Sequence, residues 1–580
     1  MKKILFAMVL LTACFTVAAQ NYKISWGEEL KLKKGTSDLE IVAADNTGYY
    51  FIETKLAGKM FSFGSPYYNT YKLIKFNNQF EQEFDESYKS ELKGLDFLSF
   101  QPLNNDLYLF ATDYIKKEKS YKVYGTTIDK SNGKLNHDFT ELGSYEIESK
   151  KDDFQAKLTK INNGKNFLLV SDLTGKDNTR LAVTLLDGSL NQKSTTNITL
   201  EYQPGFFALQ DVKLVNNNIV LLGKSFEEAE GKKKRKKKIF KSFILSIYDL
   251  KGKKLKDIPL NVENKFTLEG KLLELPNNEL ALAGFFSNDG KKKTLNGFFI
   301  DKIDIAKGEL TLSSTKEISA NMIGQNVTDD NDSADDDDDS KKDKTNKAKA
   351  LKDDDVEEFP NEFTIKSIDV SPEDGSFIIA AEISQVNSYT YTTYQPGTGT
   401  GFSSGRWTTN YVYDFINKDL LVICADKNGA IKWLNAVPKK QLETIRTSSS
   451  AGMGLSFGYN SASFFANSGG MPFYSSFKST MLKDKYVILY NDNKNNTEVA
   501  SYNDKVKTIA NFKKRGEMYG LSFDIATGKT TRKAISACSD DDVITMPRHS
   551  FVVGNAIIVP AWRQKIIGKT IFKIAKVSMQ

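Results

Sequence analysis

The sequence is poor in the residues on which catalytic and metal sites most often depend. It has only two histidines among 580 residues, so a histidine metal site would have to bring His137 and His549 together from distant parts of the chain. The metalloprotease pattern H-E-x-x-H and the P-loop are absent. We therefore expect no catalytic residues, no metal ligands and no cofactor.

Cysteine is too scarce to hold the fold together. Of the three cysteines, Cys14 lies near the N-terminus, and Cys424 lies within the apolar run LLVICAD. That position favours a buried free thiol over a disulfide with Cys538. Long hydrophobic runs are also lacking after the N-terminus, so no later segment is predicted to be a transmembrane helix.

Residues 1–20 have the three parts of an export signal. Lys2-Lys3 precede the apolar run Ile4–Ala13, and Val17-Ala18-Ala19 supplies small residues for cleavage. Leu11-Thr12-Ala13-Cys14 also resembles a lipobox, which leaves open a lipid-anchored N-terminus at Cys14. We predict an exported protein that is periplasmic, associated with the outer membrane or extracellular.

Strong overall charge is missing as well. A net charge of +7 is mild for this length, and with export it predicts no nucleic-acid partner. The charge is concentrated in two blocks, the basic run Lys232–Lys238 and the acidic segment Thr328–Glu358. Both compositions indicate solvated, flexible insertions. Clustered carboxylates at Asp335–Asp339 leave calcium binding open as an alternative, although the spacing of an EF-hand is absent.

What the sequence does contain is a repeated strand pattern. In Lys271–Phe286 (KLLELPNNELALAGFF) an apolar strand enters a tight turn and a nearly uninterrupted apolar strand returns. Asn, Asp and Gly suit such turns because they tolerate positive φ. Turns of this kind before an apolar run occur at eight places: Asp45–Gly48, Asn104-Asn105, Asn162–Gly164, Asn216–Asn218, Asn277-Asn278, Glu373–Gly375, Lys483-Asp484 and Gly554-Asn555.

A second turn series lies later in most units and joins a third strand to a fourth. It comprises Asp129–Gly133, Asp187-Gly188, Asp249–Gly252, Asp304–Gly308, Asp426–Gly429 and Asp524–Gly528. Two tight turns per unit predict a four-stranded antiparallel meander, the form of a propeller blade. An outer-membrane barrel is the alternative, but its strands must alternate apolar and polar residues. The second strands do not alternate, which indicates burial on both faces.

We therefore predict an all-β fold over residues 21–580, a β-propeller of about eight four-stranded antiparallel blades, with seven left open. The last unit supplies only three strands, and Tyr22–Lys33 has the pattern of a strand without a unit of its own. We expect this N-terminal strand to complete the last blade and so protect the open edges.

One hairpin carries a resemblance to known proteins. Asp426–Trp433 (DKNGAIKW), with its D-x-x-G-x-I-x-W pattern, resembles repeats in secreted bacterial propeller proteins. The Lys- and Asn-rich composition and the Ala19-Gln20 junction look like those of exported Bacteroidota proteins. This resemblance implies a propeller fold and brings no catalytic motif.

The long insertions between strands indicate where a binding site would lie. Flexible insertions are expected at about residues 225–238, 319–361, 387–410 and 442–477, all on the face opposite the tight turns, and such loops commonly carry binding residues. Tyrosine and tryptophan on adaptable loops offer a large contact area at low entropic cost. The candidate ligand-binding residues are Tyr389, Tyr391, Tyr394, Arg406, Trp407, Tyr411 and Trp562. Burial of these aromatics within their own loops remains the alternative.

Three function classes follow. The leading hypothesis is a non-enzymatic propeller module that binds a glycan, a peptide or an envelope protein through the long-loop face. A hydrolase of envelope or extracellular polymers stays open, because a glycosidase needs only two well-placed carboxylates. A structural subunit of an envelope complex is the third reading.

Overall fold

The computed structural model describes the chain over residues 22–32, 36–57, 68–149, 152–161, 164–230, 236–260, 262, 265–275, 279–289, 294–319, 322, 359–360, 362–395, 406–448, 472–496, 505–563 and 570–579. Strands dominate these residues, and the helices among them are single turns: α3 (Phe512–Arg515), α4 (Cys538–Asp541) and the 3-10 turn η4 (Pro547–His549). None of the described helices has the length and apolar character needed to span a bilayer.

Seven sheets of four antiparallel strands follow one another along the chain. They are sheet 1, β3 (Thr36–Asp45), β4 (Gly48–Ala57), β5 (Tyr68–Phe76) and β6 (Gln82–Ser87); sheet 2, β7 (Asp96–Leu103), β8 (Asp106–Ile115), β9 (Ser120–Ile128) and β10 (Thr140–Glu146); sheet 3, β11 (Asp153–Ile161), β12 (Asn166–Thr174), β13 (Thr179–Leu186) and β14 (Gln192–Thr199); sheet 4, β15 (Phe207–Val215), β16 (Asn218–Glu230), β17 (Lys236–Asp249) and β18 (Lys254–Leu260); sheet 5, β19 (Phe266–Glu274), β20 (Leu280–Ser287), β22 (Gly297–Asp304) and β23 (Glu309–Glu317); sheet 6, β25 (Phe363–Val370), β26 (Phe377–Gln395), β27 (Arg406–Ala425) and β28 (Ile431–Ser448); and sheet 7, β29 (Phe477–Leu482), β30 (Lys485–Asn493), β31 (Gly516–Asp524) and β32 (Thr530–Ala537). A separate two-stranded ladder joins β21 (Thr294–Leu295) to β24 (Phe359–Pro360).

The remaining sheet, sheet 8, unites the two ends of the chain. Its C-terminal part contains β33 (Ile544–Thr545), β34 (Phe551–Val553), β35 (Ala556–Arg563) and β36 (Thr570–Met579). The N-terminal strand β1 (Tyr22–Trp26) pairs antiparallel with β36, from Tyr22 opposite Met579 to Trp26 opposite Ala575. The short strand β2 (Leu30–Leu32) pairs further along β36. The N-terminal strand thus lies where the sequence predicts it.

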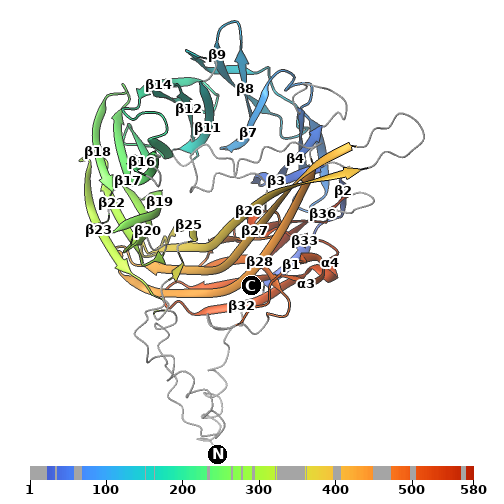
Figure 1. Cartoon of the computed structure of the whole chain (residues 1–580). Coiled ribbons are helices and arrows are strands. Elements are labelled where there is room, and N and C mark those ends of the chain that lie inside the picture. The colour runs from blue at the N-terminus through green and yellow to red at the C-terminus, as the bar shows by residue number, and fades with distance from the viewer. Residues whose placement is uncertain are drawn as a thin grey trace, which may run out of the picture.

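The sheets succeed one another around a ring, with the first strands of several sheets near its middle (Figure 1). Neighbouring first strands lie beside one another, as β3 does beside β7 and β19 beside β25. Four-stranded antiparallel sheets arranged radially in this way are a β-propeller.

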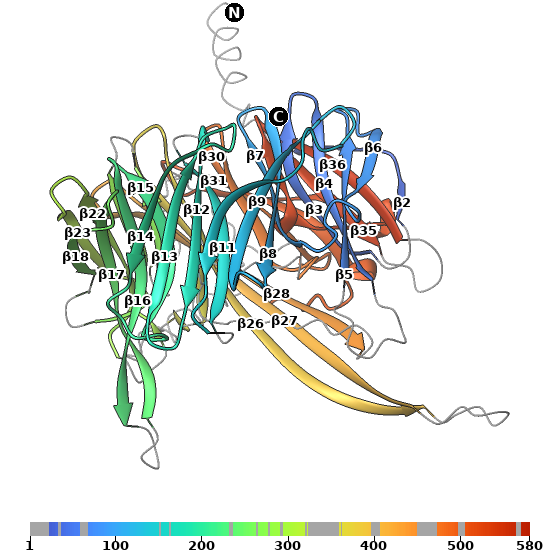
Figure 2. The same ribbon diagram turned by 90° about the horizontal axis from the view of Figure 1, so that it is seen from above.

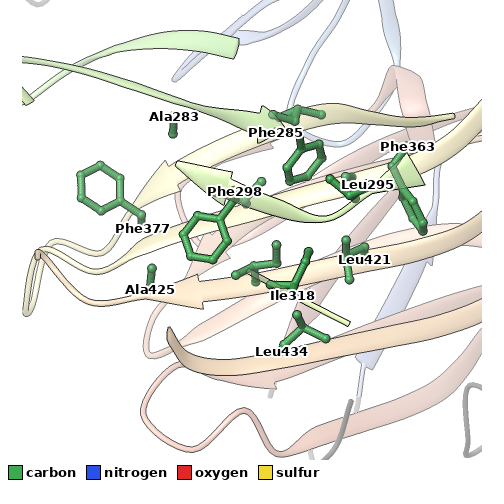
Figure 3. Close-up of a cluster of buried hydrophobic side chains, with 14 of the residues drawn as sticks. Ala283, Phe285, Leu295, Phe298, Ile318, Phe363, Phe377, Leu421, Ala425 and Leu434 are labelled. Carbon is green, nitrogen blue, oxygen red and sulfur yellow. The ribbon is translucent and has the colours of Figure 1, made fainter. Parts of the chain in front are cut away.

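The second strand of each sheet is buried on both faces, as its lack of alternation predicts. All eight residues of β20 are buried. Ala281, Ala283 and Phe285 pack with sheet 6, whereas Leu280 and Leu282 pack with sheet 4. Figure 3 shows the first of these clusters. Apolar side chains on both sides of one strand therefore join three successive sheets, and their burial is the main stabilising term.

The turns between third and fourth strands fasten each sheet to its neighbour. In the turn that begins at Asp249, the carboxylate accepts the backbone N–H groups of Lys251 and Lys253, each at 2.9 Å. The turn glycine Gly252 has φ +81°, and a Cβ on it would lie 2.4 Å from the carbonyl oxygen of Asn197 in sheet 3. Gly308, Gly429 and Gly528 combine positive φ with similar contacts to the preceding sheet, so only glycine fits.

Candidate functional site

Two long hairpins extend from the same side of the ring (Figure 2). They are formed by β16 with β17 and by β26 with β27, strands of 13, 14, 19 and 20 residues. Each hairpin joins the second and third strands of its sheet, so it belongs to the face expected to carry insertions. The prediction of flexible loops at 225–238 and 387–410 was wrong for residues 225–230, 236–238, 387–395 and 406–410, which form paired strands. Residues 231–235 and 396–405 lie outside the described part of the chain.

The second hairpin and the end of β28 form a three-stranded extension of sheet 6, which we call the long arm. It comprises Ser384–Gln395, Arg406–Asn417 and Gln441–Ser448. The pairing of β26 with β27 is continuous from Ser384 opposite Asn417 to Gln395 opposite Arg406. The expected insertion at 442–477 therefore begins with strand up to Ser448, and most of the insertion at 319–361, with Asp335–Asp339, lies outside the described residues.

The two faces of the long arm expose different residues. Successive residues of a strand point to opposite faces, and cross-strand partners share a face. Tyr389 and Tyr391 are on one face, where they are 51% and 44% exposed. Phe415 and Tyr413 are on the other face, where both are buried. The long arm thus has an outer face with exposed tyrosines, on which Val412 alone is fully buried among the residues named, and an inner face that packs on the ring at Tyr413 and Phe415.

Buried polar and apolar contacts anchor the inner face. The Glu443 carboxylate accepts backbone N–H groups from Phe473, Tyr474 and Ser475, each at 2.8 Å. Burial raises the pKa of Glu443, and these three hydrogen bonds oppose the rise. Ile445 packs on a cluster that includes Phe473. The arm is therefore fixed to sheet 8 and the segment preceding sheet 7 at its root.

The predicted ligand residue Trp562 has a different role. Its side chain is fully buried, and its ring centroid lies 4.8 Å from that of Phe473. Trp562 is on β35, a second-strand-like position between sheets, where the apolar run IIVPAW places it in the core. The prediction that it contacts ligand was wrong, since no solvent reaches it.

The other predicted residues are all on the long arm but on different faces. Tyr394, which is 51% exposed, pairs with Trp407, and Tyr411 is half-buried and pairs with Thr390. Their register places Tyr394 and Tyr411 on the face opposite Tyr389 and Tyr391. Arg406 is paired with Gln395, and the side chains of Arg406 and Trp407 lie outside the described part of the structure. Apart from Trp562, the predicted residues thus lie on one arm, but the sequence could not assign them to its two faces.

A fully buried ion pair lies at the root of the long arm. Lys439 and Glu382 are both 0% exposed, and Lys439 Nζ donates to Glu382 Oε1. Lys439 also donates to Gln441 Oε1 at 2.9 Å, and Ser476 Oγ donates to Glu382 Oε2 at 2.6 Å. Burial lowers the pKa of Lys439, an effect that the Glu382 charge opposes. A satisfied network of this kind fixes geometry more than it adds stability.

Charged residues also recur on the first strands, near the middle of the ring. A β-bulge interrupts the pairing of first and second strands in sheets 2, 4, 5 and 6. In sheets 4 and 5 the bulge is followed by an acid and, two residues later, a lysine: Asp211 and Lys213, Glu269 and Lys271. Bulges redirect side chains, so this repetition gives the inner strands a polar, charged surface.

These inner charges are linked between sheets. Glu269 Oε2 accepts the backbone N–H of Ile365 at 2.8 Å, and Lys271 Nζ donates to the carbonyl of Lys366 at 2.9 Å. Burial raises the pKa of Asp211 and Glu269 and lowers that of Lys271. The alternation of apolar and polar residues does not identify these charged residues in the sequence, because a β-bulge interrupts the two-residue period of the strand.

The shorter hairpin, β16 with β17, carries opposite charges on its two strands. Glu228 pairs with Lys238 and Glu230 with Lys236. Lys238 Nζ also lies 4.3 Å from the ring centroid of Phe206. Strand pairing thus places glutamates of β16 opposite lysines of β17 in this hairpin.

Other patterns give no site among the described residues. No group of three or more potential metal ligands occurs there. His137 is exposed and contacts Thr126 and Asp138, while His549 Nε2 lies 3.1 Å from the carbonyl of Pro472. Two G-x-S-x-G matches, Gly401–Gly405 and Gly454–Gly458, lie outside the described ranges.

Comparison with known proteins gives no family. No family model matches the chain, and no curated protein matches it. Among solved structures, the chain is similar to an ACO/RPE65 chimera, with 10% identity, 72% of this chain and 93% of that chain covered, and a TM-score of 0.29. It is also similar to the beta-propeller domain of the Trilobed protease from Pyrococcus furiosus, with 7% identity, coverage of 66% and 93%, and a TM-score of 0.29. At such scores the fold rests on the strand pairing described above, and no function follows.

Proposed function

We propose that this protein is a propeller-based binding module that holds a protein partner on the outer face of the long arm. The observation that carries the proposal is the pair Tyr389 and Tyr391, half-exposed on a strand that projects beyond the ring. Tyrosines of this kind offer large contact area at small entropic cost and are enriched at interfaces.

The composition of the outer face supports a protein rather than a glycan partner. Tyr389 lies opposite Val412, which in turn lies opposite Arg446. Asp414, on the same face, accepts a hydrogen bond from Thr444 Oγ1 at 2.6 Å. Val412 is fully buried, so the exposed part of this face consists of tyrosines with charged residues nearby. Tyrosine and arginine are enriched at protein interfaces. Anchoring of the inner face keeps this surface in place, which lowers the entropic cost of binding.

A hydrolase remains the second candidate, supported by the raised pKa values of Asp211, Glu269 and Asp369 on the first strands. Each of these carboxyl groups also has lysines nearby, such as Lys271 beside Glu269 and Lys478 beside Asp369. Acids placed among lysines are typical of ion pairing, whereas a glycosidase needs two carboxyl groups facing one another. The binding module is therefore the better-supported function.

The test compares capture by two matched surface variants. Immobilised Tyr389→Ser/Tyr391→Ser and the parent chain are incubated with cell-envelope extract. The control is Leu255→Ser/Leu310→Ser, because these residues are 52% and 42% exposed on the outer strands of sheets 4 and 5. We expect a protein that is retained by the parent and the control but lost with the tyrosine variant.

Three results would count against the proposal. Equal retention by all three chains would show that the outer face is not the binding surface. Loss of polysaccharide retention with unchanged proteins would favour the glycan alternative. A protein retained so tightly that it co-purifies in fixed ratio would favour the structural-subunit reading.

A further inference from the structure

The outer edge of β26 carries no strand partner in the long arm. β25 pairs with β26 only as far as Phe363 opposite Ile383. From Gln385 to Thr392, β26 pairs with β27 on one side, and no strand of the described chain pairs with its other side. The side chains from Asn387 to Tyr394 are all exposed. Residues Ser388–Thr392, which we call the edge segment, thus present an accessible row of backbone groups.

This edge lacks the features that usually prevent association. Sheet edges are commonly protected by charged residues, proline or bulges. Gln385–Gln395 (QVNSYTYTTYQ) contains no charged residue, proline or glycine, and its pairing with β27 is free of register shifts. Tyrosine and threonine also favour strand structure. The edge is therefore suited to accept another strand.

The sequence of the edge indicates which strand it accepts. Read in either direction from Thr390, the nearest residues at equal distance are chemically alike. Tyr389 matches Tyr391 and Ser388 matches Thr392, and further out Gln385 matches Gln395. Two identical antiparallel strands related by a two-fold axis bring such positions opposite one another. A charged residue near the axis would face its own copy, and none is present.

We propose that two copies of this chain associate through the edge segment, pairing β26 antiparallel with β26 of the partner subunit and placing Thr390 on the two-fold axis. Tyr389 then lies opposite Tyr391 of the partner subunit, and Ser388 lies opposite Thr392 of the partner subunit. Aromatic pairs and hydroxyl pairs across strands stabilise such a ladder. The two long arms become one continuous sheet of six strands.

The dimer goes beyond the proposed function and is tested separately from it. In the dimer, four tyrosines form one cluster on the outer face, which enlarges the surface offered to a partner protein. The experiment uses purified chain alone, so its result does not depend on whether a partner is captured.

Cysteine cross-linking tests the register. Three full-length variants are oxidised under mild conditions: Thr390→Cys, Ser388→Cys and Thr392→Cys. We expect Thr390→Cys to form covalent dimers, because this residue faces its own copy. The other two variants should cross-link several-fold less alone, but an equal mixture of the two should reach about half the yield of Thr390→Cys, because about half of its dimers place the two cysteines opposite one another. All variants carry Cys14→Ser, because Cys14 could itself be oxidised. Leu255→Cys, exposed on sheet 4, measures random collision, and the native Cys424 and Cys538 are buried.

A charge variant supplies an independent measurement. Sedimentation should show a concentration-dependent dimer for the parent chain. Thr390→Lys should weaken this dimer by roughly fivefold or more, because two lysines face one another at the axis. Its far-UV circular dichroism and melting temperature should match those of the parent, since the position is exposed.

Three outcomes would overturn the proposal. One is a parent chain that stays monomeric at all concentrations. Another is cross-linking of Thr390→Cys no greater than that of Leu255→Cys. The third is equal cross-linking by all three edge variants with no gain on mixing, which would show contact without a fixed register.

Discussion

The indole nitrogen of Trp433 donates a hydrogen bond to the carbonyl oxygen of Ile525, 2.8 Å away. Trp433 belongs to the fourth strand of sheet 6, and Ile525 to the turn between third and fourth strands of sheet 7. In the same turn, the carbonyl of Gly528 accepts a hydrogen bond from Asn435 Nδ2 at 2.9 Å. The D-x-x-G-x-I-x-W hairpin thus stabilises the contact between two sheets as well as its own turn.

Gly528 should be intolerant of any side chain. Its φ is +72°, and a Cβ there would lie 2.6 Å from the Trp433 ring. We expect Gly528→Ala to lower the free energy of unfolding by about 2–4 kcal/mol, combining backbone strain with overpacking. Gly554→Ala is the control, because Gly554 has φ +56° but nothing within 4 Å of the added Cβ; it should cost about 1 kcal/mol. Equal losses in urea unfolding would contradict a packing role for Trp433.

Breaking the buried ion pair between Glu382 and Lys439 should lower the free energy of unfolding more than breaking an exposed ion pair does. Lys439→Met leaves the Glu382 carboxylate buried with Lys366 Nζ at 3.6 Å as its remaining cation, so we expect a loss of about 3–5 kcal/mol. Lys432→Met, on the same strand, breaks a 2.9 Å exposed pair with Asp374 and should cost about 1 kcal/mol or less. The double variant Glu382→Leu/Lys439→Met should recover much of the loss. Chemical denaturation measures all three, and similar losses for both single variants would refute the distinction.

Two phenylalanines of sheet 5 allow a buried side chain to be compared with an exposed one. Phe285 is 0% exposed between sheets 5 and 6, whereas Phe266 is 54% exposed. Phe285→Ala should lower the free energy of unfolding by about 3–5 kcal/mol. Phe266→Ala should change it by about 0.5 kcal/mol or less. If the two variants unfold at the same urea concentration, the packing of β20 between sheets 4 and 6 is contradicted.

Stability should depend on pH through Asp172. Burial raises the pKa of this carboxyl to about 6. Because the folded state binds the proton more tightly, Asp172 contributes full stability below about pH 4 and loses it as pH rises toward 6. Asp172→Asn should therefore be more stable than the parent at pH 7, by about 1–3 kcal/mol, and equal to it near pH 4.

Asp187 is the control, because its pKa is shifted in the opposite direction to that of Asp172. Hydrogen bonds and Lys193 lower its pKa to about 2, so its contribution is present at pH 7 and lost in acid. Asp187→Asn should be less stable than the parent at neutral pH, with the difference shrinking as pH falls. Unfolding curves at about pH 2.5, 4, 5.5 and 7 cover the range in which each carboxyl group titrates. They would contradict both assignments if the two variants changed in the same direction.

Much of the ring follows from local patterns in the sequence. Runs such as LALAGFF predict strands buried on both faces, and Asp…Gly spacings predict the turns, because backbone conformation and two-sided burial leave clear signals. The N-terminal strand was recognisable because the last unit lacked one. These features depend on neighbours in sequence or on a repeated unit.

The functional features were harder to predict because they depend on register and on distant residues. Gly-, Ser- and Thr-rich composition indicated loops at 387–410, yet pairing with β27 extends the strand through Tyr389 and Tyr391. From the sequence, Trp562 was predicted to bind ligand. In the fold, residues distant in the sequence, such as Phe473, pack against it and bury it. Lys439 on β28 contacts Glu382 on β26, and β27 lies between these two strands. Nothing in either segment alone indicates that contact.

Pairing of β1 with β36 has a consequence for biosynthesis. Of the described strands, β1 is synthesised first, and its hydrogen-bonding partner β36 is synthesised last. At about 5–20 residues per second, roughly half a minute to two minutes separate the synthesis of β1 from that of β36. Until β36 is made, the edge of β1 that pairs with it is open, so we expect the folding chain to depend on chaperones during that interval.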